Sequence, residues 1–261
     1  GGAVPLEIPL KDDFTLDPVT LERQVTGGKP NVVFFARPNN PTGTLWERAT
    51  IEALAARHAD LVVVIDEAYA EYAGETMLDL VAGRENVLVM RSLSKVGLAG
   101  LRLGVLVGPA ALVREIEKVR LPYNVNALTQ RAAAFLLGTH GASLRARGDA
   151  IVAERDTLAA ALATRAGLTV YPSRANFLLV RTPDAPALHA ALLARGVLVR
   201  NLHAPGPLAN CLRITIGAPD ENAAFLRALD AALATLAAPP VSAADPDQAK
   251  EDTEDEPDDE T

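Results

Sequence analysis

The chain has 261 residues, of which 49% are hydrophobic and 22% charged, a balance typical of a globular protein. The net charge of -8 resides in residues 238–261, which hold ten acidic residues and one lysine, so the preceding part is nearly neutral and offers no field for nucleic acid or an anionic membrane. The single cysteine excludes an intrachain disulfide and a multi-cysteine metal site, and it is typical of a cytoplasmic protein. No apolar run approaches the ~20 residues of a membrane span.

Short apolar runs and helical stretches follow one another through the first half of the chain. The apolar runs predict strands at residues 32–36, 61–65, 87–90 and 104–107, and helical spacing predicts helices at 47–58 and 110–120. Because these runs are apolar throughout rather than alternating, we expect the strands to be covered on both faces. This pattern predicts an α/β fold with a mainly parallel sheet flanked by helices.

The second half of the chain has a different pattern, with longer helices and shorter strands. We expect helices at 126–137, 142–166, 185–195 and 221–236, and strands at 168–171, 176–180, 197–200 and 212–216. This order is typical of a smaller α+β domain. The predicted domains are therefore a large domain at 1–150, a small C-terminal domain at 151–237, and a disordered acidic tail at 238–261.

Polar residues follow three of the predicted strands, at the ends where ligands gather in a helix-flanked parallel sheet. The first loop, residues 37–43, has two prolines, a glycine and the amide of Asn40, and by itself could be only a rigid turn. In the second, Asp66 and Tyr69 follow a buried strand, and Asp66 could simply cap a helix. The third, residues 91–104, combines hydroxyls, glycines, an arginine and Lys95, which by itself could be a solvated charge.

The three loops together form an ordered set of motifs: Asn-Pro-Thr-Gly at 40–43, Asp-x-x-Tyr at 66–69, and Ser-x-Ser-Lys at 92–95 with a downstream arginine. This set resembles the fold-type-I aminotransferases that depend on pyridoxal 5′-phosphate. Within them the chain is most similar to the histidinol-phosphate aminotransferases, which is also suggested by further short motifs at residues 122–126, 175–177 and 212–215. The resemblance covers about residues 1–236 and leaves out the tail.

The resemblance assigns a role to each residue around the cofactor. Lys95 would form a Schiff base with the cofactor aldehyde and later act as general base, and Asp66 would keep the pyridine nitrogen protonated. Tyr69 and Asn40 would bond the phenolate oxygen of the cofactor. Its phosphate would be held by Ser92, Ser94 and Arg102, although Arg102 lies seven residues after Lys95 and many relatives place this arginine eight residues after it.

The substrate residues are also implied by the resemblance. Arg213 matches the arginine that receives a substrate carboxylate, and its guanidinium suits a phosphate equally well. Arg200, at the end of another predicted strand, is either a second cation for that phosphate or part of a surface salt bridge. Tyr123 and Asn176 would line the pocket. The implied reaction converts histidinol phosphate and 2-oxoglutarate into imidazole-acetol phosphate and glutamate, with a small-molecule amino donor and a 2-oxo acid as the only partners besides a second subunit of a homodimer.

Four other interpretations compete with this one. The chain could instead be an aromatic aminotransferase or a decarboxylase of threonine phosphate. An alternative of another class is that it is a non-catalytic remnant that only dimerises or binds a partner. A nicotinamide enzyme would have the same fold class, but residues 97–104 do not match the dinucleotide fingerprint.

Relatives carry a substantial N-terminal segment ahead of the point where this sequence begins, and residues 4–10 correspond to a strand that follows it. That segment supplies a helix N-terminus for the cofactor phosphate. We therefore expect the 261-residue chain to hold its cofactor weakly and to have weak or no activity without it.

Overall fold

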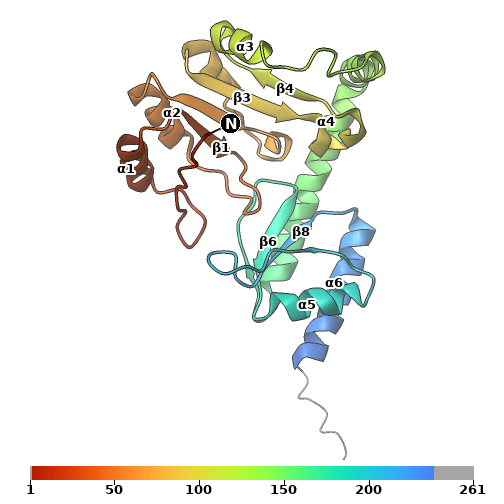
Figure 1. Cartoon of the computed structure of the whole chain (residues 1–261). Helices are drawn as coiled ribbons and strands as arrows, with labels where there is room; N and C mark the ends of the chain where they lie inside the picture. The colour runs from red at the N-terminus through yellow and green to blue at the C-terminus, as the bar shows by residue number, and fades with distance from the viewer. Residues whose placement is uncertain (1, 238–261) are drawn as a thin grey trace, which may run out of the picture.

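The computed structural model describes residues 2–237, and the predicted disordered tail at 238–261 lies outside the described residues. Two four-stranded sheets form separate layers, one built from the first half of the chain and the other from the second half (Figure 1). A long helix, α4 (Ala127–Ala163), runs from the first sheet to the second. The arrangement confirms the predicted fold class, a mainly parallel helix-flanked sheet with a smaller α+β part.

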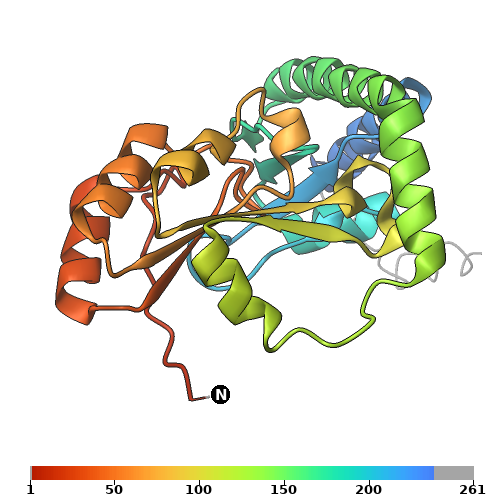
Figure 2. The same ribbon diagram turned by 90° about the horizontal axis from the view of Figure 1, so that it is seen from above.

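The first sheet has the strand order β1-β2-β3-β4, with three parallel strands and an antiparallel edge strand. The apolar runs predicted as strands supply all four. Their bounds are β1 (Val32–Ala36), β2 (Val62–Asp66), β3 (Val87–Ser92) and β4 (Gly104–Val107). The helices beside this sheet are α1 (Pro18–Gly28), α2 (Arg48–Arg57) and α3 (Ala110–Glu117), and Figure 2 shows α2 and α3 on opposite sides of it.

Cover on both faces, which the apolar runs led us to expect, is incomplete along β1 and β4. Val33 and Phe35 of β1 are buried in the core with α1 and α2, whereas Val32 and Phe34 point to the other face and are 44% and 66% exposed. Successive side chains of a strand lie on opposite faces, so an apolar run exposes every second residue where one face lacks a covering helix. The prediction of two covered faces is therefore wrong for these two strands.

Helix α1 was not among the predicted elements, although its start has a recognisable signal. Asp17 is the N-cap and accepts a hydrogen bond from the backbone N–H of Thr20 at 2.9 Å, and Pro18 occupies the first turn. The strand expected at residues 4–10 is absent from the structure, which gives this segment no regular secondary structure. Pro5 and Pro9 lack backbone N–H groups, so the segment cannot complete a ladder of hydrogen bonds.

Helix α4 replaces the two helices predicted at 126–137 and 142–166. It is a single helix of 37 residues, which Figure 2 shows bending along its length. Asn126 caps it by accepting a hydrogen bond from the N–H of Thr129 at 2.9 Å. None of the helices within residues 2–237 is both long and apolar enough to cross a membrane.

The second sheet is antiparallel, with the strand order β5-β6-β8-β7. Its elements are β5 (Thr169–Val170), β6 (Phe177–Arg181), α5 (Ala185–Leu193), β7 (Arg200–Asn201), β8 (Cys211–Thr215) and α6 (Pro219–Ala237). One face packs on α4, α5 and α6, and the other contacts Phe14 from the N-terminal segment. Strand β7 has only two residues and starts where the predicted strand 197–200 ends.

Candidate active site

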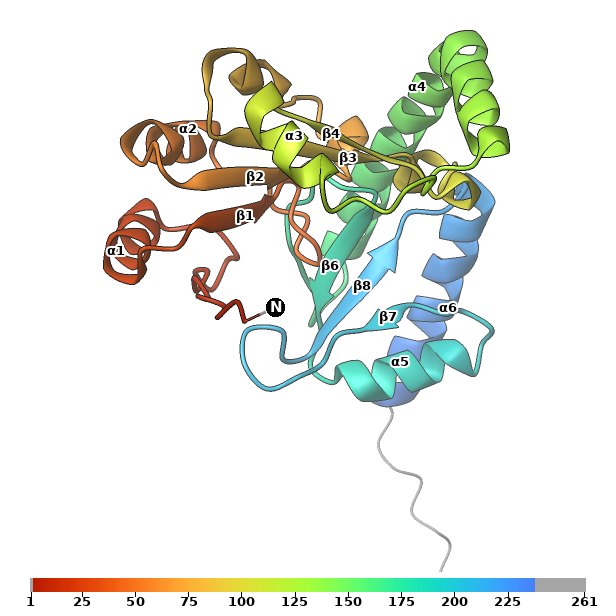
Figure 3. The ribbon, with the colours of Figure 1, turned by 45° about the horizontal axis from the view of Figure 1, so that its top comes forward.

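The three loops singled out in the sequence lie at one edge of the first sheet. Strands β1, β2 and β3 are parallel, and their register sets Ala36 beside Asp66 and Asp66 beside Met90. The chain therefore leaves all three strands at the same edge, and Figure 3 shows the second sheet facing this side of the first. Side chains from the three loops can meet here because parallel strands end together.

Lys95 lies in a short 3₁₀ turn, Leu93–Val96, which directly follows β3. Its amine lies 5.3 Å from the centre of the Tyr69 ring, a distance at which a cation is attracted by an aromatic face. The side chain of Lys95 is exposed. The backbone carbonyl of Lys95 accepts a hydrogen bond from the hydroxyl of Tyr72, a residue that the sequence analysis missed.

Asp66 is the last residue of β2 and is half-buried. One of its carboxylate oxygens accepts a hydrogen bond from the backbone N–H of Ala68 at 3.0 Å, which holds the turn that leads to Tyr69. Among the ion pairs of residues 2–237, none involves Asp66. The turn therefore fixes the carboxylate without neutralising its charge, and the group can still pair with a positive ligand.

A buried ion pair supports this turn from below. The Glu67 carboxylate is almost completely buried and accepts hydrogen bonds from the guanidinium of Arg91 at 2.9 Å and the hydroxyl of Thr76 at 2.7 Å. The backbone N–H of Met77 donates a further bond to it at 2.5 Å. A buried charge is tolerated when it is paired and fully hydrogen-bonded, and this network ties the residue after Asp66 to β3.

Ser92 is the last residue of β3, and Ser94 and Arg102 lie in the connection between β3 and β4. Ser92 pairs with Gly104 across the two strands, so this connection folds back on itself. The Ser92 hydroxyl accepts a hydrogen bond from the backbone N–H of Ser94 at 3.1 Å. Arg102 is exposed and adopts a left-handed backbone conformation with φ of 50°, which ends a second 3₁₀ turn. The connection thus presents two hydroxyls and a guanidinium at the edge that holds Lys95.

Arg213 of β8 reaches this edge from the second sheet. Its Nη1 donates a hydrogen bond to the side-chain oxygen of Asn40 at 2.7 Å, although 173 residues separate the two. The guanidinium carbon lies 5.1 Å from the centre of the Phe177 ring, which in turn meets the ring of Tyr69 edge-on at 5.2 Å. The Nε of Arg213 is buried and has no partner within the described chain. A buried unpaired N–H of this kind is costly, which favours an anionic ligand here.

The other predicted substrate residues have different positions. Arg200 is exposed and lies directly opposite Arg213 in the pairing of β7 with β8. Asn176 is half-buried beside Phe177, and its backbone carbonyl accepts a hydrogen bond from the N–H of Ile216. Tyr123 is 96% exposed in the loop between α3 and α4, and within residues 2–237 it has no ring contact or side-chain hydrogen bond with the other site residues. The structure therefore does not bring Tyr123 into the cluster.

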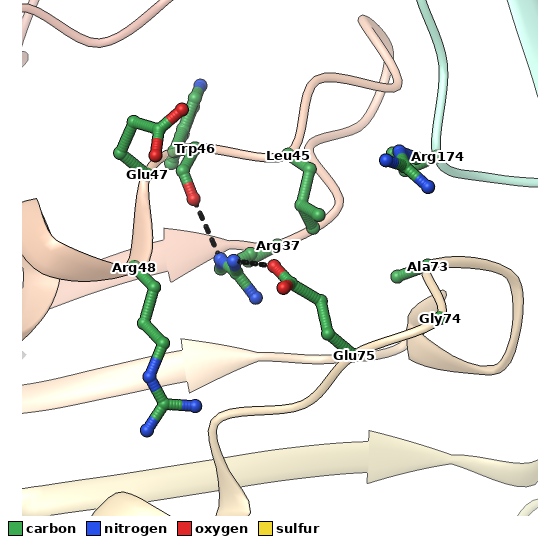
Figure 4. Close-up of a pocket in the computed structure, with 9 residues that line it drawn as sticks. All are labelled: Arg37, Leu45, Trp46, Glu47, Arg48, Ala73, Gly74, Glu75 and Arg174. Carbon is green, nitrogen blue, oxygen red and sulfur yellow. Dashed lines mark hydrogen bonds and ion pairs between the residues drawn. The ribbon is translucent and has the colours of Figure 1, made fainter.

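A cavity of about 420 Å³ lies beside the loop that follows β1, and none of the predicted site residues lines it (Figure 4). Two of its three arginines already have acidic partners, and Arg174 has none among residues 2–237. Arg37 donates hydrogen bonds to the carbonyl of Trp46 and to Glu75, and Arg48 pairs with Glu52 and Asp79. Paired guanidinium groups have little attraction left for an anion. Only the exposed Arg174 remains unpaired here, so we assign no function to this cavity.

Comparison with known proteins identifies the family. Residues 1–229 match the family described as aminotransferase class I and II. Histidinol-phosphate aminotransferase 1 of Burkholderia lata is 49% identical over 227 residues, which are 87% of this chain and 63% of that protein. The chain thus spans a little under two thirds of the length of the curated relatives it matches.

Two solved structures have the same fold. Histidinol-phosphate aminotransferase of Sinorhizobium meliloti in complex with pyridoxal-5′-phosphate is 26% identical, with a TM-score of 0.77 over 88% of this chain and 64% of that one. L-threonine-O-3-phosphate decarboxylase of Porphyromonas gingivalis is 29% identical, with a TM-score of 0.70 over 78% of this chain and 65% of that one. By the match over residues 1–229 and the shared fold, this chain belongs to the class I and II aminotransferase family.

Proposed function

We propose that this chain is the cofactor-binding and substrate-binding core of a pyridoxal 5′-phosphate-dependent aminotransferase that interconverts histidinol phosphate and 2-oxoglutarate with imidazole-acetol phosphate and glutamate. The observation that carries the proposal is the hydrogen bond between Arg213 and Asn40. It joins an anion-binding guanidinium of the second sheet to the edge of the first sheet where the Lys95 amine lies over Tyr69.

The side chains at this edge fit the cofactor group by group. Lys95 offers an amine for its aldehyde, and Asp66 offers a carboxylate without a cationic partner in the described chain for its ring nitrogen. The hydroxyls of Ser92 and Ser94, with the guanidinium of Arg102, are suitable donors for a phosphate. Asn40 keeps its amide N–H groups free to donate while its oxygen accepts from Arg213.

The bound cofactor supplies an aldehyde that condenses with amines and a ring that accepts electrons from the substrate carbon. The residues of this chain perform the remaining steps. Asp66 would hold a proton at the ring nitrogen, and Tyr69 and Asn40 would donate to the phenolate oxygen. The Lys95 amine, on a flexible four-carbon stem, would carry the proton between the substrate carbon and C4′ of the bound cofactor. Arg213 orients the substrate by its anionic group.

The choice of substrate rests on the relatives and on one pair of arginines. Curated relatives named histidinol-phosphate aminotransferase reach 47–49% identity. Arg200 and Arg213 lie opposite each other on antiparallel strands, which sets two positive charges on the same face. Like charges in this position repel unless an anion lies between them, and a phosphate monoester carries enough charge to bind both. The proposed partners are therefore a phosphorylated amino donor, a 2-oxo acid, and a second subunit of a cytoplasmic homodimer.

Covalent labelling tests the proposal. Pyridoxal 5′-phosphate is added to the purified chain, the change in absorbance is followed, and the adduct is reduced with borohydride and located by peptide mapping. We expect the label on Lys95 and its loss in Lys95→Ala. Lys118→Ala is the matched control, because Lys118 is an exposed lysine that pairs with Glu115 on α3. A label on any other lysine, or one that persists in Lys95→Ala, would contradict the site assignment.

A further inference from the structure

Tyr72 is a buried tyrosine whose hydroxyl donates a hydrogen bond to the backbone carbonyl of Lys95. It ends the 3₁₀ turn Ala70–Tyr72, which follows the Asp66–Tyr69 turn. The turn that contains Lys95 is itself short, with Gly97 and Leu98 both donating backbone hydrogen bonds to the carbonyl of Leu93. Because 3₁₀ turns have poor hydrogen-bond geometry, one bond from a rigid neighbour contributes much to the position of the lysine backbone.

The position of Tyr72 is fixed by contacts on several sides. Its ring belongs to a buried cluster with Tyr69, Ala175 and Phe177, so both sheets contribute to its surroundings. Burial raises the pKa of the Tyr72 phenol, and the nearby Glu71 carboxylate raises it further. The hydroxyl therefore stays protonated across the physiological range and remains a donor.

Arg155 of α4 fixes the backbone of the same residue. Its side chain is about 5% exposed, and its Nη1 donates to the carbonyl of Tyr72 at 3.2 Å and to that of Ala175 at 3.3 Å. A guanidinium is buried at a cost unless its donors find acceptors. Here the acceptors come from the turn beneath Lys95 and from the segment that enters β6, with the arginine on the helix that links the two sheets.

We propose that Tyr72 is a positioning residue, which holds the Lys95 backbone so that the amine faces the site at the edge of the first sheet. This inference rests on the proposed function for the identity of the amine. A displacement of about 1 Å in a reacting group is enough to slow an enzyme roughly a hundredfold, so a single bond at this backbone has a large effect on the chemistry. The backbone hydrogen bonds that close the turn end on the carbonyl of Leu93, so the bond from Tyr72 is an additional restraint that acts on Lys95 itself.

The test compares two variants that each remove one hydroxyl. Tyr72→Phe removes the donor to Lys95, and Tyr171→Phe removes a hydroxyl that accepts from Arg181 Nε at 2.9 Å, away from the lysine. Amide hydrogen exchange is measured on the cofactor-free chain. In Tyr72→Phe we expect the amides of Gly97 and Leu98 to exchange about tenfold faster, the effect of losing one hydrogen bond. In Tyr171→Phe their exchange stays at the wild-type rate.

A spectroscopic readout follows on the chain loaded with pyridoxal 5′-phosphate. The pH midpoint of the cofactor absorbance shifts in Tyr72→Phe and is unchanged in Tyr171→Phe. Only the first variant removes the hydrogen bond that fixes the backbone of Lys95, and with it the position of the amine attached to the cofactor. Unchanged exchange at residues 97 and 98 in Tyr72→Phe overturns the inference and leaves the proposed function intact. A borohydride label on another lysine overturns the proposed function. Faster exchange at these amides in Tyr72→Phe would still show that the Tyr72 hydroxyl stabilises the backbone at residue 95.

Discussion

Arg200 and Arg213 show how two residues of one strand pair can have different surroundings. Arg213 is held at the candidate site by its hydrogen bond to Asn40 and its contact with the Phe177 ring, whereas Arg200 is exposed on a two-residue edge strand. If a phosphate binds between them, Arg200 contributes charge-assisted hydrogen bonds to the phosphate alone. We therefore expect Arg200→Ala to weaken the binding of histidinol phosphate about tenfold, as measured by titration calorimetry on the chain loaded with cofactor.

The control ligand is histidinol, which lacks only the phosphate and should bind Arg200→Ala as it binds the unmodified chain. Arg195→Ala is the control variant, since Arg195 is exposed two residues after the end of α5 and donates to Thr235 of α6 at 2.8 Å. An equal loss of affinity for both ligands would indicate a structural effect. Unchanged affinity for histidinol phosphate would assign Arg200 to the surface, the alternative that the sequence left open.

At the scale of elements, two glycines predict opposite effects of the same substitution. Gly138 lies inside α4, and a Cβ at this position meets no other atom within 4 Å. Gly138→Ala should therefore stabilise the chain by about 0.5–1 kcal/mol, because alanine loses less backbone entropy in a helix. The free energy of unfolding in urea measures the effect, and a loss of stability would mean that the bend of α4 depends on this glycine.

Gly43 is the matched comparison, in the loop that follows β1. Its φ of +76° is a left-handed conformation, and a Cβ would overlap the side chain of Ser173 from the second half of the chain. Its carbonyl also accepts a hydrogen bond from the N–H of Arg174 at 2.8 Å. Gly43→Ala should cost about 2 kcal/mol or more in the same measurement, from backbone strain and overpacking together. If Gly43→Ala were as stable as the unmodified chain, the strain and the overlap with Ser173 would both be refuted.

The elements that the sequence predicted well are those with a local signal. Residues 32–36 and 104–107 form strands with the predicted bounds, since a short apolar run between turn residues has few other stable conformations. Helix α1 was missed because Asp17 and Pro18 were not read as a helix start. The division of α4 into two helices was wrong because Gly138 and Gly141 weaken a helix without ending it when both flanks are helical.

The site residues found from the sequence are likewise those in local motifs, and those that were missed depend on long-range contacts. The motifs of residues 40–43, 66–69 and 92–95 led to one edge of the sheet, where the structure places them, and their chemical roles remain predictions. Tyr72 and Arg155 could not be found from the sequence, because their importance depends on contacts with residues 23 and 20 positions away or more. The bond from Arg213 to Asn40 spans 173 positions and likewise requires the folded chain.

At the scale of the whole molecule, the exposed apolar side chains are concentrated in one stretch. The 119–135 segment comprises the loop that follows α3 and the start of α4. Five of its large apolar side chains are more than half exposed, Val119, Leu121, Tyr123, Leu128 and Phe135. Monomeric proteins rarely leave so many large apolar side chains in contact with water over a short stretch, which favours contact with another protein surface.

We therefore expect the chain to self-associate through the 119–135 segment, in line with the homodimer proposed above. The sedimentation coefficient should rise with protein concentration, and the double variant Leu121→Asp with Leu128→Asp should abolish the rise, because two carboxylates would have to be buried without partners. Val19→Asp is the control, since Val19 is an equally exposed apolar residue on α1, outside the segment. A sedimentation coefficient that stays constant with concentration in the unmodified chain would contradict this prediction. A rise that persists in the double variant would place the contact elsewhere, and the uncovered face of the first sheet around Phe34 would be the next surface to test.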